Sequence, residues 1–445
     1  MLNRKYIKIL VAITILFGLW FIITPLPDPV FDDPYATTLL AEDGTLLNAS
    51  IADDMQWRFP PSDSLPDKFK TAIRLYEDEY FYYHFGVNPV SIVRAISQNI
   101  EAGEIVSGGS TLSMQTIRMS LGNKERTYWQ KFVEVMATFK LELLYSKEDI
   151  MKTYADHAPF GGNIVGLKAA SYRYYNRSPF QLSWAETAVL AVLPNHPASI
   201  FPGRNDKLLR QKRDQLLTKL KNKGILTDDE LEMAMAEPLP GKKKSLPQLS
   251  YHLLHRAIKD GAKGTNIHST LDANLQVRVN RAVESHSKKM AANHIYNAAA
   301  VVIEISSGKT LAYTGNSDNP GIHGQHVDVI TALRSPGSLL KPILYASAID
   351  EGLILPQQLL KDIPLFYEGF NPKNFNKKYK GAVPANEALT SSLNVPFVHL
   401  LIAHGHEKFL QKLKNVGFES FSHAPDHYGL SMILGGAETS LWEIT

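Results

Sequence analysis

Apolar residues recur at helical spacing over much of the first half of the chain. Phe69, Ile73 and Tyr76 lie three or four positions apart, and residues 132–143 repeat the same spacing. A period near 3.6 residues indicates amphipathic helices with one buried face. We therefore expect a mostly α domain over residues 60–237.

The N-terminus carries a basic end and a long apolar run. Three basic residues within the first eight positions precede the uncharged stretch Ile9–Thr24, and prolines from Pro25 onward end it. This pattern is typical of an export signal. Because no small-x-small cleavage site precedes the prolines, it favours a signal-anchor helix within residues 1–30 over a cleaved signal. The basic flank predicts a single-pass protein of the cell inner (cytoplasmic) membrane, with everything after Pro25 on the extracytoplasmic side.

Strand-like patterns occur twice. Residues Thr38 to Asn48 predict a hairpin around the turn at Asp43-Gly44, inside a juxtamembrane segment 31–59. Residues 298–313 predict a strand, a turn and a second strand, and helical patterns follow. This order predicts an α/β second domain.

The boundary between the two domains is expected just after the helical pattern ends. The segment Pro238-Leu-Pro-Gly241 and the three lysines behind it break that pattern, which predicts a linker over residues 238–296. The second domain then covers residues 297–445.

Composition narrows the class of protein. The 445 residues are 44% hydrophobic and 20% charged, which suits a multi-domain globular chain and excludes disorder or a small disulfide scaffold. A balance of 47 Lys+Arg against 44 Asp+Glu leaves a net charge of +3 and predicts no nucleic-acid partner. The absence of cysteine excludes thiol catalysis and Cys-ligated zinc, and no His/Asp cluster has metal-ligand spacing.

The first group of candidate residues begins with the carboxylate pair Glu77-Asp78, followed by Phe81 and His84. A glutamate beside aromatic residues can have a pKa raised by desolvation, which suits proton transfer near neutral pH. A solvated acidic helix end is the alternative. The segment Ser107–Gln115 that follows is rich in glycine and hydroxyl groups, so it is either an anion-binding loop or a plain loop before a helix.

Cations follow this loop. Arg118 and Arg126 flank a short segment, and Lys131 and Glu134 lie at i,i+3 on the next predicted helix. Three cations and a carboxylate suit a diphosphate better than a sugar alone. For Lys131 and Glu134 an ordinary surface ion pair is the alternative.

The order of these motifs resembles the peptidoglycan glycosyltransferase domain of class A penicillin-binding proteins over residues 60–240, and the segment His157–Asn163 resembles the 1C branch of that family. The resemblance implies a lysozyme-like fold that polymerises lipid II into a growing glycan strand. It makes Glu77 the general base on the acceptor 4-hydroxyl and Glu134 a second carboxylate near the departing undecaprenyl diphosphate. It requires no cofactor, although a divalent cation could bridge to the diphosphate. The implied substrate-binding residues are Asp78, His84, Ser110, Thr111, Gln115, Arg118, Arg126 and Lys131.

A second candidate group begins at Ser338, with Lys341 three positions later. Pro342 is tolerated only in a first helical turn, so a helix should begin close to Ser338. Such a pair is common by chance, but its flanks and the later Ser392-Leu-Asn394 resemble the first two motifs of the penicillin-binding transpeptidase domain. The resemblance implies that peptide stems or β-lactams acylate Ser338, which Lys341 activates. Ser392 and Asn394 would relay protons and position the substrate.

The third motif of that domain, Lys-Thr/Ser-Gly, does not occur between Asn394 and Thr445. We therefore expect a transpeptidase domain that is incomplete at its C-terminus, and no crosslinking by this chain. A lytic glycosidase on the same fold and a catalytically idle penicillin-recognising scaffold remain the alternatives. The sequence identifies no protein partner.

Overall fold

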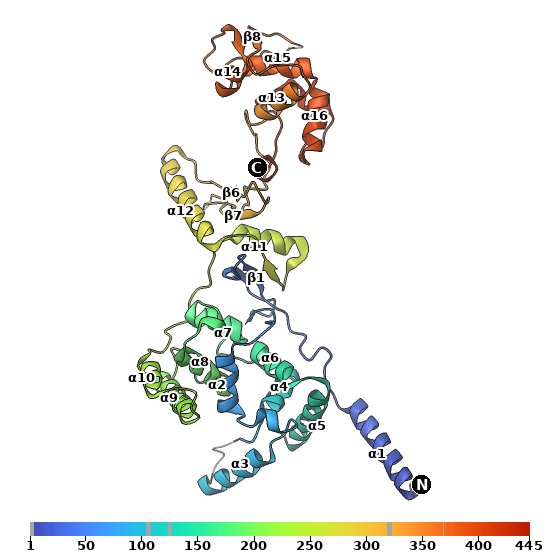
Figure 1. The fold of residues 1–445 in the computed structure, drawn as a ribbon, viewed down its shortest axis with the longest axis vertical. Helices are drawn as coiled ribbons and strands as arrows, with labels where there is room; N and C mark the ends of the chain where they lie inside the picture. Colours follow the sequence, from blue (N-terminus) through green and yellow to red (C-terminus); the bar gives the residue numbers. More distant parts are fainter. Residues whose placement is uncertain (1–3, 104–107, 123–126, 318–322, 368) are drawn as a thin grey trace. The chain divides into compact units, whose positions relative to one another are not determined.

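The computed structural model describes residues 4–103, 108–122, 127–317, 323–367 and 369–445. The chain divides into two compact units (Figure 1). The first contains residues 1–248 and 254–269, and the second contains residues 249–253 and 270–445. The domain boundaries drawn from the sequence stay predictions.

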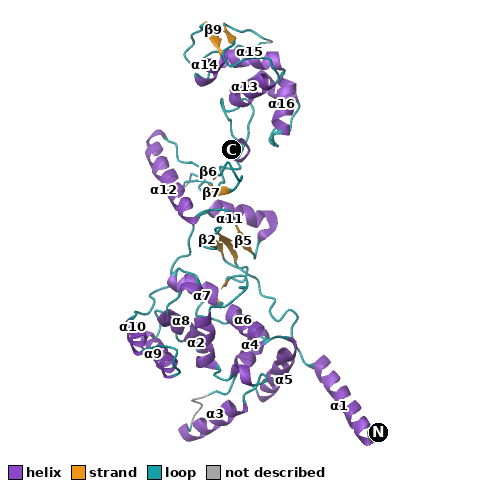
Figure 2. Cartoon of the chain, in the orientation of Figure 1, coloured by secondary structure: helices purple, strands orange, loops and turns teal. Residues whose placement is uncertain are grey.

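The first unit is mostly helical (Figures 1 and 2). Its core surrounds α8, in which every residue from Ala185 to Val192 is buried, and Phe69 and Ile73 of α2 pack into the same core. The helical pattern read from the sequence is therefore confirmed. The helices are α2 (Asp67–Glu77), α3 (Pro89–Ala102), α4 (Leu112–Ser120), α5 (Tyr128–Leu144), α6 (Lys147–His157), α7 (Leu167–Tyr175), α8 (Trp184–Val192), α9 (Asp206–Asn222) and α10 (Asp228–Ala236), with short turns η1 (Phe81–Tyr83), η2 (Pro179–Gln181) and η3 (Leu193–Asn195).

The predicted hairpin is present. Strands β1 (Thr37–Leu40) and β2 (Leu46–Ser50) pair antiparallel, and β5 (Asn266–His268) adds a parallel strand to β1 that the sequence did not predict. Two further short strands, β3 (Trp57–Arg58) and β4 (Ile164–Val165), pair in parallel.

Helix α1 (Arg4–Ile23) precedes this sheet. Lys140 of α5 donates to the carbonyl oxygens of Phe21 at 2.8 Å and Thr24 at 3.1 Å, which satisfies acceptors at the C-terminal end of α1. Across the described part of the chain, no helix combines the length and apolar character needed to span a membrane. The signal anchor therefore stays a prediction.

The second unit is α/β, as expected. Strands β6 (Ala300–Ile303) and β7 (Thr310–Thr314) form an antiparallel pair, and α12 (Ala273–Met290) packs on β7. Buried Gln276 of α12 accepts from the Tyr313 N–H at 2.8 Å and donates to its carbonyl oxygen at 3.1 Å. This helix lies within the segment that the sequence suggested as a linker.

The helices and strands after residue 338 share a separate apolar core around Leu344, Phe397 and Phe409. They begin with α13, which starts at Lys341 with Pro342 in its first turn, so the predicted helix start is confirmed. The elements not yet named are α11 (Tyr251–Ala257), η4 (Ile258–Ala262) and η5 (Ala291–Asn293), which precede this core, and then α13 (Lys341–Asp350), β8 (Leu359–Asp362), β9 (Gly381–Pro384), α14 (Ala385–Thr390), α15 (Asn394–His404), α16 (His406–Asn415), α17 (Pro425–Tyr428), η6 (Gly429–Leu434) and α18 (Leu441–Ile444). Helix α11 begins in the second unit and ends, with η4, in the first.

Candidate active site

Glu77 is the last residue of the amphipathic helix α2, and it is partly buried. Its two carboxylate oxygens accept from two side-chain amides. Gln115 Nε2 lies 2.7 Å from Oε2, and Asn195 Nδ2 lies 3.3 Å from Oε1. Burial raises the pKa of the Glu77 carboxyl, and the two amides and the charges of Lys212 and Arg118 oppose that rise only in part. The site therefore holds a half-buried carboxylate with an elevated affinity for a proton.

Asp78 is buried and bonded within the protein. Its oxygens lie 3.0 and 3.1 Å from His84 Nε2, and Oδ2 accepts from the backbone N–H of Leu112 at 3.2 Å. Leu112 is the first residue of α4, so Asp78 joins the end of α2 to the start of the helix that carries Gln115. His84 and Asp78 thus fix the position of Gln115 relative to Glu77.

The loop before α4 is held by close backbone approaches. Thr111 caps α4 by accepting from Met114 N at 3.2 Å, and its hydroxyl donates to the carbonyl oxygen of Gly86. A Cβ on Gly86, whose φ is +76°, would lie 2.6 Å from Thr138 Cγ2. A Cβ on Gly109 would lie 2.9 Å from Ile92 Cα. Gly86 lets the segment before α3 pack against α5, and Gly109 lets the loop before α4 pack against α3, so larger residues at either position would displace these segments.

The predicted pair on α5 is present, and the loop contributes to it. Lys131 Nζ lies 3.1 Å from Glu134 Oε2 and 3.2 Å from Ser110 Oγ. Glu134 is buried, whereas the Lys131 side chain is 46% exposed, so the ammonium remains available to an anion. Arg118 occupies the last turn of α4 and acts electrostatically on Glu77. Arg126 lies outside the described residues.

The sequence missed three residues at this site. Lys212 of α9 lies 3.1 Å from the hydroxyl of Tyr76 and 3.5 Å from Asn195 Oδ1, and Asn195 contacts Glu77 directly. Asn195 and Lys212 come from segments far along the chain, and no local pattern marks them. Burial and the neighbouring Glu77 carboxylate raise the pKa of the Tyr76 hydroxyl, so it stays neutral.

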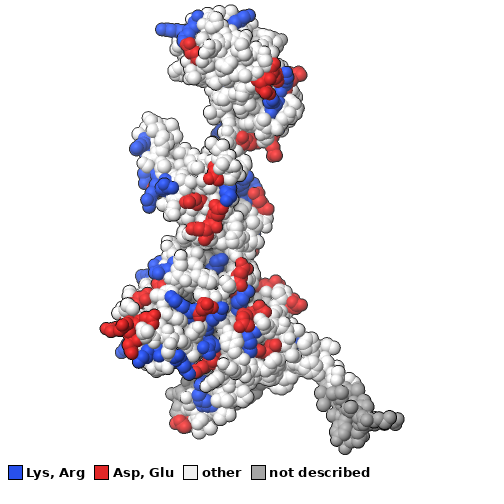
Figure 3. All heavy atoms as spheres, viewed as in Figure 1, with Lys and Arg blue, Asp and Glu red and all other residues white. Residues whose placement is uncertain are grey.

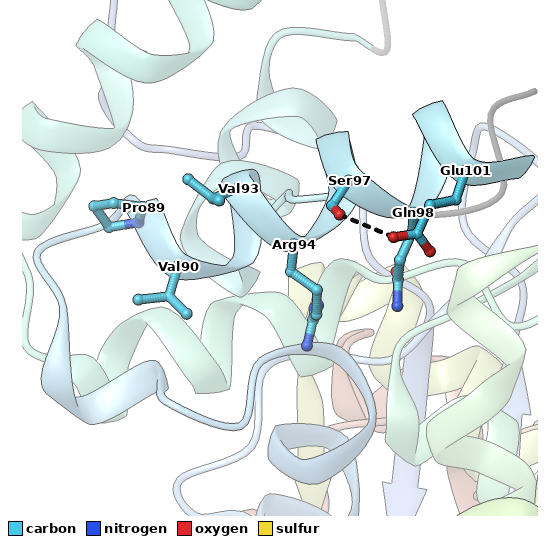
Figure 4. A pocket seen from close by; sticks show the side chains of 7 residues that line it. All are labelled: Pro89, Val90, Val93, Arg94, Ser97, Gln98 and Glu101. Carbon is cyan, nitrogen blue, oxygen red and sulfur yellow. Dashed lines mark hydrogen bonds between the residues drawn. The ribbon is translucent and has the colours of Figure 1, made fainter. Parts of the chain in front are cut away.

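A surface hollow runs along α3 (Figure 4). Its lining includes Val90 and Val93, which are exposed, and Arg94; Ser97 donates to Glu101 at 3.3 Å. On the face of the helical unit drawn in Figure 3, acidic and basic side chains are interspersed, in keeping with the small net charge. That face carries no stripe of one sign.

Lys341 is the centre of the second candidate site. Its side chain is buried, and Nζ donates to Ser392 O at 2.9 Å, Ser392 Oγ at 3.3 Å and Asn394 Oδ1 at 2.8 Å. All three acceptors are neutral, and burial lowers the pKa of Lys341 to about 8. The structure thus brings together three of the four residues expected here.

Ser338 stands one turn before α13, and its carbonyl oxygen accepts from Lys341 N at 3.1 Å. Within the described residues its hydroxyl makes no hydrogen bond to Lys341, Ser392 or Asn394. The backbone of Asn394 is bonded to the buried side chain of Asn374, which the sequence did not mark as a site residue. Asn374 Oδ1 accepts from Asn394 N at 3.0 Å, and Asn374 Nδ2 donates to Asp362 Oδ1 at 2.8 Å.

The second unit contains one candidate group of metal ligands within the described residues. Among the described residues, one group of His and carboxylate side chains has ligand atoms close enough for an ion, namely His406, Glu407 and Asp426, and it lies in the second unit. Glu134 belongs to no such group within the same residues. The side chains around Glu134 therefore offer a cation one carboxylate, already shared with Lys131.

Known proteins resemble this chain along most of its length. Penicillin-binding protein 1C of Escherichia coli (strain K12) is 35% identical over 417 residues, covering 93% of this chain and 54% of that protein. Penicillin-binding protein 1F of Bacillus subtilis (strain 168) is 30% identical over 391 residues, covering 84% and 54%. The chain thus spans about half the length of the curated relatives it matches. A solved structure of penicillin-binding protein 1A from Haemophilus influenzae aligns with 93% of this chain and 67% of its own, with a TM-score of 0.43 and 16% identity.

Two family models match separate parts of the chain. The transglycosylase model matches residues 43–221, and the penicillin binding protein transpeptidase domain model matches residues 298–444. Their order is that of the two motif groups, with Glu77 in the first match and Ser338 in the second. The chain therefore belongs to the class A penicillin-binding protein family, with a helical glycosyltransferase domain followed by an α/β transpeptidase domain.

Proposed function

We propose that the helical unit polymerises lipid II into glycan strands, and that Glu77 is the general base of the reaction. The observation that carries the proposal is the Glu77 carboxylate itself. It is half-buried, its pKa is raised, and two amides fix its orientation. A carboxylate of this kind takes up a proton near neutral pH more readily than an exposed one does.

In the proposed step, Glu77 removes the proton from the acceptor 4-hydroxyl, and the oxygen attacks the anomeric carbon of the donor sugar. The bond between that carbon and the phosphate oxygen breaks, the configuration inverts, and undecaprenyl diphosphate leaves with the bonding electrons. Glu77 ends the step protonated and returns the proton to solvent.

The leaving diphosphate needs cations, and the charges on α4 and α5 supply them. Lys131 is exposed beside Glu134 and Ser110, and Arg118 lies at the end of α4. Ammonium and guanidinium groups form charge-assisted hydrogen bonds with phosphate oxygens. Glu134 orients Lys131 in this proposal, and Arg126 adds a further cation. The step requires no cofactor; a divalent cation, if one takes part, is brought by the substrate diphosphate.

The apolar surface near the site suits a lipid-linked substrate. Val90 and Val93 of α3 and Trp129 and Phe132 of α5 are exposed. We propose that these side chains face the membrane or the lipid chain, and that the basic, apolar N-terminus anchors the protein in the inner membrane with both domains outside the cytoplasm. The growing glycan strand is then made at the membrane surface.

For the second unit we propose acyl transfer at Ser338. Lys341 has a lowered pKa and contacts Ser392 and Asn394, which supports its role as the base that activates a serine. Peptide stems and β-lactams are the proposed acyl donors.

The proposed polymerase is tested with radiolabelled lipid II and, in parallel, with preformed glycan strands. We expect the purified chain to convert lipid II into polymer with release of the lipid diphosphate, and to leave the preformed strands intact. Cleavage of those strands without polymer formation would identify a lytic glycosidase instead. Neither activity, with penicillin still bound, would identify an idle scaffold.

A further inference from the structure

The side chain of Asn195 lies between a cation and the carboxylate of Glu77. Lys212 Nζ is 3.5 Å from Asn195 Oδ1, and Asn195 Nδ2 is 3.3 Å from Glu77 Oε1. An ammonium group only donates hydrogen bonds, whereas an amide presents an acceptor on one side and donors on the other. The lysine therefore selects the orientation in which the amide oxygen faces it and the amide NH₂ group faces Glu77.

Lys212 is itself held in place. Its Nζ also lies 3.1 Å from the hydroxyl of Tyr76, the residue next to Glu77 on α2, and its side chain is half-buried against α2 and η3. Both neighbours of the ammonium group lead to Glu77, because Tyr76 precedes Glu77 in the sequence and Asn195 is hydrogen-bonded to it.

We propose that Lys212 is a positioning residue that orients Asn195 toward Glu77 and supplies the positive charge that keeps the Glu77 carboxylate ready to accept a proton. The inference rests on the proposed function of Glu77 as a base. It adds a residue to that site whose side chain acts through Asn195 and through its charge.

Loss of Lys212 has two effects on Glu77, and both change its pKa in the same direction. Among the residues that the structure describes, the charged and titratable groups that face Glu77 are Lys212 from α9, Arg118 from α4, Tyr154 from α6 and Tyr76 on its own helix. Without Lys212, Arg118 is the remaining cation of this set. The rise in the Glu77 pKa that desolvation causes is then opposed less. The amide of Asn195 is also free to turn its oxygen toward Glu77, which favours the protonated carboxyl. Both effects raise the pKa of Glu77.

The test compares the pH dependence of lipid II polymerisation in three variants. Lys212→Met removes the charge and the hydrogen-bond donor, and Lys212→Arg keeps both. Lys221→Met is the matched control, because Lys221 lies on the same helix but pairs with Asp228. A general base must be ionised to act, so the rate falls as pH falls through its pKa. For Lys212→Met we expect this acidic limb to move upward by about half to one pH unit, a loss of about three- to tenfold in rate on that limb. Lys212→Arg and Lys221→Met should follow the parental profile.

A second readout does not depend on activity. Carbodiimide with an amine nucleophile modifies protonated carboxyls, so the pH midpoint of Glu77 labelling, followed by mass spectrometry, reports the ionisation of this side chain. The midpoint should rise in Lys212→Met and return in Lys212→Arg. An unchanged midpoint and acidic limb in Lys212→Met, or equal shifts in Lys221→Met, would overturn the inference. If the proposed function is wrong, the parental chain makes no polymer. The labelling midpoint still tests the role of Lys212 in that case.

Discussion

The ionisation of Lys341 can be predicted quantitatively. Burial lowers its pKa from 10.5 to about 8, and its three hydrogen-bond acceptors, from Ser392 and Asn394, are neutral oxygens. At pH 7 about one molecule in ten then carries a neutral Lys341, whereas an ordinary lysine is neutral about once in 3000. The fold thus increases the amount of neutral amine about 300-fold.

The assay is an NMR titration of the chain with ¹³C-labelled lysine side chains. The Lys341 signal is identified by its absence from Lys341→Met. We expect a midpoint near pH 8 in the parental chain. In Asn394→Asp a carboxylate replaces the amide oxygen 2.8 Å from Nζ, which should raise the midpoint by about one to three units.

Asn415→Asp is the matched control, because it adds the same charge at the exposed end of α16. It should leave the midpoint of Lys341 unchanged. A parental midpoint at pH 10 or above would refute the argument that desolvation controls this lysine. No response to Asn394→Asp would refute the contact between Lys341 and Asn394.

Three further outcomes are expected. Arg118→Ala and Arg126→Ala should each lower polymerisation and lipid II affinity about 10- to 100-fold if they contact the diphosphate; parental values in both would exclude that contact. Asp78→Ala leaves His84 and the buried N–H of Leu112 without their acceptor, so it should lower the free energy of unfolding in urea by about 3 kcal/mol; a change below about 1 kcal/mol would contradict this role. Fluorescent penicillin should label the chain only at Ser338, because Lys341, three positions later, has a lowered pKa and can activate a serine; labelling of Ser338→Ala would contradict this expectation.

Local patterns predicted the elements whose signal is local. The Asp43-Gly44 turn between two short strand-like segments predicted the hairpin of β1 and β2, and the position of Pro342 predicted the start of α13. Strand β5 was missed because it is three residues long and pairs with β1 more than 200 positions away. A segment that short carries no periodicity of its own, so its pairing depends on tertiary contacts alone.

The residues of the candidate site also divide into those that local patterns predicted and those that only the folded chain brings together. The ion pair of Lys131 and Glu134 follows from i,i+3 spacing on a helix, and the contact of Gln115 with Glu77 agrees with their place in one series of motifs. Asn195 lies in a 3₁₀ turn and Lys212 in a later helix, and no local pattern in either segment marks these residues as part of an active site. Only the folded structure brings them to Glu77.

The central claim is that Glu77 is the base for glycan polymerisation, and the most direct test is the rate constant of Glu77→Gln on lipid II. The substitution preserves the size of the side chain and removes its capacity to accept a proton, so the rate should fall about 10²- to 10⁴-fold while the circular dichroism spectrum and the melting temperature change little. A Glu77→Gln chain that folds normally and polymerises lipid II within threefold of the parental rate would contradict the claim.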